Sequence, residues 1–132
     1  MLKRKITQQL IDWKTSSEKA MLVTGARQIG KSYAIREFAK QEYQTYVEIY
    51  LYDNKAATKA LLTASSMDDF LSRLSLFAQT DMIPGNTLIF IDEVQEAPDI
   101  MTMVKFLVQD GRFDYIFSGS MLGTEFKGVR SY

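Results

Sequence analysis

The sequence contains no cysteine and no histidine. Disulfides, thiolate or imidazole metal ligands and cysteine nucleophiles are therefore excluded. Acid–base catalysis by histidine is excluded for the same reason. The absence of cysteine is consistent with a cytoplasmic protein, which is the location we expect.

An excess of charge of one sign and long hydrophobic runs are also absent. Sixteen basic residues balance sixteen acidic ones, so the formal net charge is zero. This balance does not indicate a general attraction to nucleic acid, although it leaves room for a local basic patch. Fully apolar runs such as residues 88–91 are far too short to span a bilayer, and no signal-peptide core follows the basic residues near the N-terminus. We therefore expect no membrane partner.

What the chain does contain is a large apolar fraction, because hydrophobic residues make up 46% of it. Such a fraction in 132 residues predicts a packed globule with a single core of moderate size. No repeat, low-complexity tract or interdomain linker is visible. We therefore expect residues 1–132 to form one domain.

One stretch fits the pattern G-x-x-x-x-G-K-[ST], in which backbone N–H groups wrap the phosphates of a nucleotide. The Lys31 ammonium would contact the β- and γ-phosphates, and the Ser32 hydroxyl would bind Mg²⁺. The motif counts only where a strand enters it and a helix leaves it, and residues 20–24 and 33–40 have those patterns. We expect the nucleotide to be bound by Gly25, Ala26, Arg27, Gln28, Ile29, Gly30, Lys31, Ser32 and Tyr33.

Strand and helix patterns alternate along the chain. This alternation predicts βαβ crossovers and a mainly parallel sheet in a three-layer α/β sandwich. In such sheets ligands bind outside the carboxyl ends of the strands, where the loop, Asp92–Glu93 and Ser118–Ser120 would meet. Strands are predicted at residues 20–24, 46–52, 87–91 and 115–117, and helices at residues 2–14, 33–40 and 55–62, from Ser66 onward and from Pro98 to Gly111.

Two adjacent acids follow the buried strand at residues 87–91. We assign Asp92 to Mg²⁺, acting through water, and Glu93 to the water that attacks the γ-phosphate. The alternative is that both acids belong to an ordinary acidic turn after the strand. Ser118 and Ser120 would contact the γ-phosphate or this water, and a plain Ser-Gly turn explains them equally well.

Two arginines are further candidates for phosphate contacts. Arg27 would reach a phosphate or a neighbouring subunit, unless it points into solvent. Arg130 has the chemistry of an arginine finger. Its place near the end of the chain favours an ordinary surface charge instead.

The motifs together resemble prokaryotic AAA-type P-loop ATPases, in which an ATPase domain precedes a C-terminal domain of unknown function. The resemblance implies that Lys31 and Ser32 bind phosphate and Mg²⁺, that Asp92 is the metal acid and that Glu93 is the catalytic acid. It places Ser118 and Ser120 at a sensor-like position. It rests on Trp13-Lys14, residues 25–32, Phe90-Ile91-Asp92-Glu93-Val94-Gln95 and Ser118-Gly119-Ser120-Met121-Leu122-Gly123.

The chain departs from the resembling proteins in its length. They continue into a fifth strand, a lid and a further domain, so we expect a fragment of a longer protein, truncated after the fourth strand. Without the fifth strand, residues 20–24 would form an unpaired sheet edge prone to self-association. Absent lid groups also put hydrolysis by the fragment in doubt.

The leading hypothesis is hydrolysis of ATP that drives a missing domain. Alternatives are a nucleotide-gated binding switch with little hydrolysis and a small-molecule kinase. Glu93 beside Asp92 favours activated water over an acceptor hydroxyl, and no acceptor-binding segment is visible. No base-reading motif separates ATP from GTP.

Overall fold

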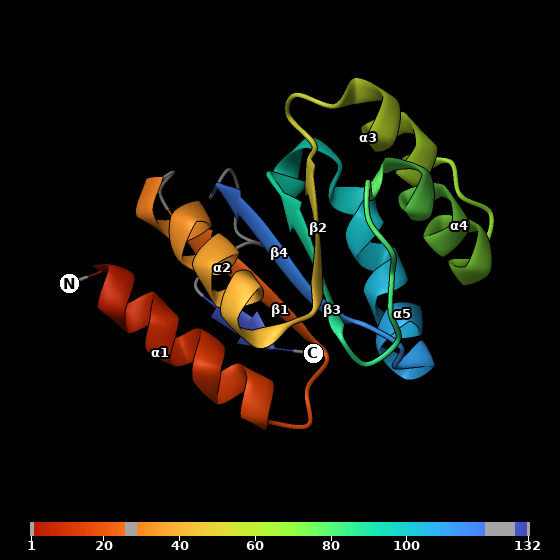
Figure 1. Ribbon diagram of the computed structural model, residues 1–132. Coiled ribbons are helices and arrows are strands. Elements are labelled where there is room, and N and C mark those ends of the chain that lie inside the picture. The colour runs from red at the N-terminus through yellow and green to blue at the C-terminus, as the bar shows by residue number, and fades with distance from the viewer. Residues whose placement is uncertain (1, 26–28, 121–128, 132) are drawn as a thin grey trace.

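A five-stranded sheet forms the middle layer of the molecule (Figure 1). The computed structural model describes residues 2–25, 29–120 and 129–131. In the described residues the strand order is β2-β3-β4-β1-β5, and the first four strands run parallel. The strands are β1 (Ala20–Gly25), β2 (Thr45–Tyr50), β3 (Thr87–Asp92), β4 (Asp114–Ser120) and β5 (Val129–Ser131).

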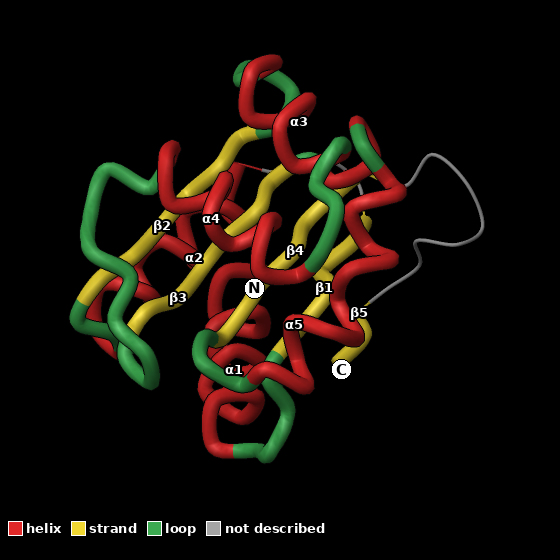
Figure 2. The backbone as a smooth tube through the Cα atoms, turned by 90° about the vertical axis from the view of Figure 1, so that its right-hand side faces the viewer, coloured by secondary structure: helices red, strands yellow, loops and turns green. Residues whose placement is uncertain are grey.

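Helices cover both faces of this sheet, and Figure 2 shows the strands behind α3, α4 and α5. One face carries α1 (Leu2–Thr15) and α2 (Ile29–Glu42). The other carries the remaining helices, and together the layers form the expected three-layer α/β sandwich. These are α3 (Lys55–Leu62), α4 (Met67–Phe77), the 3-10 turns η1 (Val94–Glu96) and η2 (Pro98–Met103), and α5 (Val104–Asp110).

The core is divided by the sheet into two apolar clusters. Along β3, Leu88 and Phe90 pack with α1 and α2, whereas Ile89 and Ile91 pack against the opposite layer. This alternation follows from the two-residue period of a strand. Because both faces are covered, every residue of β3 is buried, as the continuous apolar run predicted.

The prediction of an unpaired first strand is wrong. β5 pairs antiparallel with β1, in the register Met21↔Ser131, Leu22↔Arg130 and Val23↔Val129. The sheet therefore extends one strand beyond the four that were predicted, and β1 has a neighbour on each side. The self-association expected from an open β1 edge loses its physical basis.

Local capping explains several helix boundaries. The Asn54 side chain accepts a hydrogen bond from the backbone N–H of Ala57, and α3 starts at the next residue after this cap. Ser66 caps α4 through Asp69 N–H, as predicted. Gly111 ends α5 with a φ of 74°, a left-handed conformation that glycine adopts without a Cβ penalty.

The helix predicted from Pro98 to Gly111 is divided in the structure. Its first six residues form the 3-10 turn η2, and the α-helix begins only at Val104. No side-chain hydrogen bond caps the start of η2. Short 3-10 turns are a common way for such a helix end to satisfy its backbone groups. None of the described helices is both long and apolar enough to cross a bilayer.

Candidate functional site

The carboxyl ends of the parallel strands bring the predicted polar segments together. β1 and β4 pair in register, so that Gly25 lies opposite Ser120 and Val23 opposite Ser118. β3 lies on the other side of β4 and ends at Asp92. The structure therefore confirms that the start of the loop, Asp92 and the Ser-Gly-Ser segment meet at one edge. Ser118 and Ser120 belong to β4 itself instead of following it.

The structural context of the glycine-rich motif matches the expectation. β1 runs into the motif and ends at Gly25, and α2 leaves it from Ile29. The N-terminus of a helix offers free N–H groups and a positive dipole end to an anion. Of the remaining loop residues, Ala26, Arg27 and Gln28 lie outside the described residues. Gly25, Ile29 and Gly30 are placed through their backbone.

Asp92 connects the motif helix to β4. The Ser32 hydroxyl donates to Asp92 Oδ2 at 3.3 Å, and the Ser118 hydroxyl donates to Oδ1. The backbone N–H of Glu93 also donates to Oδ1, at 2.9 Å. Asp92 is only 7% exposed, and a buried carboxylate needs such donors to offset its lost hydration. The predicted metal residues Ser32 and Asp92 therefore lie in contact.

The oxygen atoms of Ser32 and Asp92 fit a hard divalent cation. Mg²⁺ prefers oxygen ligands and is usually held by one or two carboxylates together with substrate phosphates and water. No group of three or more acidic side chains that could hold a metal ion occurs among the described residues. The donors suit Mg²⁺ shared with a nucleotide better than an ion enclosed by protein alone.

Glu93 lies beside Asp92 but has different partners. Its backbone is left-handed, with φ 60° and ψ 49°, and the residue is 6% exposed. The Gln95 side-chain amide donates to Glu93 Oε2 at 3.0 Å. A non-glycine residue in this conformation costs about 1–2 kcal/mol, and such strain concentrates at functional sites. The two carboxylates therefore have different hydrogen-bond partners, and their separate roles stay a prediction.

The remaining predicted residues are placed less completely. Lys31 is partly buried in the first turn of α2, and Tyr33 is 46% exposed on the same helix. Ser120 and Arg130 are placed through the backbone of β4 and β5, and their side chains are not among those described. The roles predicted for these four residues stay predictions.

Sequence reasoning missed a charged network behind the motif helix. Arg36, one helical turn after Ser32, donates twice to the Glu48 carboxylate of β2, both times at 2.9 Å. The Tyr46 hydroxyl donates to the same carboxylate. Burial alone would raise the pKa of Glu48, but the hydrogen bonds from Arg36 and Tyr46 lower it. The network ties α2 to β2. Its only sequence signal is the alternation of Tyr46 and Glu48 on one strand face.

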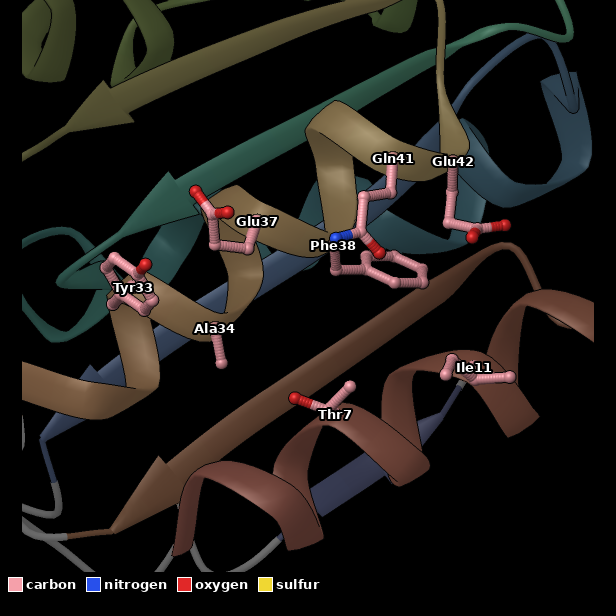
Figure 3. Close-up of a pocket in the computed structure, with 8 residues that line it drawn as sticks. All are labelled: Thr7, Ile11, Tyr33, Ala34, Glu37, Phe38, Gln41 and Glu42. Atoms are coloured by element: carbon pink, nitrogen blue, oxygen red, sulfur yellow. The ribbon is translucent and has the colours of Figure 1, made fainter.

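A separate pocket of about 200 Å³ lies between α1 and α2, away from Asp92 (Figure 3). Of the predicted nucleotide-binding residues whose side chains the structure describes, Tyr33 lines it. Figure 3 shows the Tyr33 ring at one end of this pocket and Ile11 and Glu42 toward the other, with Thr7 between them. The pocket is lined by Thr7, Ile11, Tyr33, Ala34, Glu37, Phe38, Gln41 and Glu42.

The fold and the motif context define a nucleotide-binding α/β domain of the P-loop kind. A family model described as an AAA domain matches residues 17–131, so the chain belongs to this AAA family. Membership makes it an ATPase-like nucleotide-binding domain. No curated protein matches the sequence.

Proposed function

We propose that this domain binds ATP together with Mg²⁺ and hydrolyses the bond between the β- and γ-phosphates. The observation that carries the proposal is the position of Asp92. This buried acid contacts the hydroxyl of Ser32 on the motif helix and that of Ser118 on β4. A second acid, Glu93, lies next to it with a separate hydrogen-bond partner. Hydrolysis needs one acid to hold Mg²⁺ and a second to accept a proton from the attacking water, and Asp92 and Glu93 would take these two roles.

In this proposal the motif helix and Asp92 bind the phosphate end of the nucleotide. Backbone N–H groups at the start of α2 and the Lys31 ammonium would hold the phosphate oxygens. Ser32 and Asp92 hold Mg²⁺, directly or through water. When bound, Mg²⁺ neutralises charge that develops on the β- and γ-phosphate oxygens.

Glu93 is the proposed general base. Its carboxylate accepts a proton from water while the water oxygen bonds to the γ-phosphorus. The bond from that phosphorus to the β,γ-bridging oxygen breaks, and ADP and phosphate are released. Ser118 and Ser120 stand nearby on β4, where a hydroxyl would hold the γ-phosphate or the water. Arg130 remains a weaker candidate for stabilising the transferred phosphoryl group.

The proposal extends to what hydrolysis serves. By analogy with proteins of the family, the free energy released would move a following domain in cis. ATP is the proposed nucleotide on the same analogy. Asp92 and Glu93 together favour water as the acceptor, so a kinase reaction finds no supporting contact in the described residues.

The test is nucleotide binding and phosphate release by the purified chain with Mg²⁺. Glu93→Gln should retain ATP affinity and lose about two orders of magnitude or more in turnover, because general-base catalysis contributes on this scale. If Glu93→Gln leaves slow turnover unchanged, a nucleotide-gated switch replaces the hydrolase.

Lys31→Ala should weaken ATP binding by about 10- to 100-fold, since a hydrogen bond to a charged group contributes about 1.5–3 kcal/mol. Lys40→Ala is the matched control, because Lys40 lies on the same helix and its ammonium pairs with the Glu37 carboxylate at 3.7 Å. Unchanged affinity in Lys31→Ala would contradict the assignment of the motif.

A further inference from the structure

We infer that Gln95 is a positioning residue for Glu93 and that Gly119 provides the space in which its side-chain amide lies. The inference rests on the proposed function, in which Glu93 receives the proton of the attacking water. It adds a hydrogen bond within the loop that carries the two acids, and a close steric approach of that loop to β4.

The first observation is the contact between the two side chains. Gln95 Nε2 donates to Glu93 Oε2 at 3.0 Å, and Glu93 is buried. Only one residue, Val94, separates them, and the left-handed backbone of Glu93 is followed directly by the turn η1, which contains Gln95. The turn carries the amide back toward the carboxylate. A carboxylate accepts hydrogen bonds only, so the amide nitrogen is the atom that faces it.

The second observation concerns the opposite side of the Gln95 amide. A Cβ atom added at Gly119 would lie 2.7 Å from Gln95 Oε1 and 3.3 Å from Val94 Cγ1. The Gln95 amide oxygen therefore lies against the position that a Cβ atom would take at Gly119 on β4. Any other residue at position 119 would push the amide aside. This accounts for a glycine between the two serines without any special φ angle.

A hydrogen-bond donor on one oxygen of a buried carboxylate fixes the orientation of the whole group, its second oxygen included. A general base must lie within hydrogen-bond reach of the water it deprotonates, and small displacements of catalytic groups are costly. Gln95 would therefore set the direction of the Glu93 carboxylate, while β4 sets the position of Gln95. Ser118 on the same strand holds Asp92, so β4 would align both acids.

The contact itself can be tested without nucleotide. NMR of the free chain follows the side-chain N–H₂ signals of Gln95, assigned through their disappearance in Gln95→Met. Replacing Glu93 by alanine should shift these signals, and Gly119→Ala should shift them as well by displacing the amide. Signals that stay unchanged in both variants would overturn the inference.

Its consequence is tested by turnover. Gln95→Met keeps the length of the side chain and removes the donor, so kcat should fall by about 10- to 100-fold while the Kd for ATP stays within about twofold. In the Glu93→Gln background the same change should cause no further loss, since it acts through Glu93. Gly119→Ala should lower kcat similarly and add little to Gln95→Met. Gln109→Met, at an exposed position on α5, is the matched control and should leave kcat unchanged.

The outcomes separate the two proposals. A large loss in Glu93→Gln with wild-type kcat in Gln95→Met overturns the positioning role alone. A higher kcat in Gln95→Met also overturns it, because the amide would then restrain Glu93 instead of aligning it. Unchanged turnover in Glu93→Gln removes Glu93 as the base, and the proposed function fails with it.

Discussion

An aspartate stands at each end of the parallel sheet, and the two are held in different ways. Asp92, at the carboxyl end of β3, accepts hydrogen bonds from the Ser32 and Ser118 hydroxyls. Asp114, at the amino end of β4, accepts from the Tyr43 hydroxyl at 2.6 Å, and the Lys19 ammonium lies 3.9 Å away. The partners of Asp92 suit a site that binds and releases a ligand, whereas the partners of Asp114 suit a fixed structural link.

The difference follows from the chemistry of the partners. Serine hydroxyls can rotate and can also act as acceptors or ligands, so those around Asp92 can rearrange when a cation or phosphate arrives. The tyrosine and lysine near Asp114 come from the segments leading into β2 and β1. Their contacts tie the amino ends of β2 and β1 to the amino end of β4. Position in the sheet therefore separates a chemical role from a structural one for the same residue type.

The largest expected effect is on phosphate release, when the negative charge of the aspartate at each end of the sheet is removed in turn. Asp92→Asn should lower Mg²⁺-dependent phosphate release by about two to three orders of magnitude, because charge stabilisation through a metal is worth several kcal/mol. Asp114→Asn, its counterpart, should leave turnover unchanged. Phosphate release at saturating ATP measures both. Equal losses in the two variants would erase the functional distinction between the ends.

A smaller effect is expected in stability from Tyr43→Phe. Loss of the hydroxyl that Asp114 accepts should lower the free energy of unfolding by about 1–3 kcal/mol, since a hydrogen bond to a charged group is removed. Nucleotide affinity should not change. Urea unfolding at neutral pH measures the first quantity, and a wild-type midpoint would show that this contact does not tie the strand ends.

The same tyrosine predicts a dependence on pH. Burial, followed by the hydrogen bond to Asp114, raises the pKa of Tyr43. The unfolded chain ionises near the ordinary tyrosine pKa of about 10, whereas folded Tyr43 stays neutral there. Its contribution is therefore complete below about pH 10 and is lost as the pH rises further. Urea unfolding from pH 8 upward should show a shallower loss in Tyr43→Phe than in wild type.

The smallest effect belongs to the ion pair between Lys19 and Asp114. The Lys19 side chain is 45% exposed, and exposed pairs contribute about 0–1 kcal/mol that salt screens. Lys19→Met should therefore change the unfolding midpoint slightly at low salt and not at all at high salt. A loss that persists in high salt would mean that packing of the lysine stem, and not its charge, acts at this end.

Local patterns predicted most elements because their signals are short-range. The helix at residues 55–62 has the predicted bounds, and the strand at residues 87–91 is extended only by Asp92. β5 was missed because three residues carry no periodicity, and its partner β1 lies more than a hundred residues away along the chain. The Arg36–Glu48 network was missed for a different reason, because an arginine on a helix is usually a solvated charge.

The sequence by itself determined the glycine-rich motif, the alternation of strands and helices, and the acids that follow the third strand. These depend on residue type and spacing, which a linear chain displays. Only the tertiary structure decided that Ser32 and Ser118 both contact Asp92, and that β5 pairs with β1. It also decided that the Gln95 amide lies against Gly119 and donates to Glu93. These contacts depend on distances between strands and on one left-handed backbone angle, which form only when the sheet is assembled.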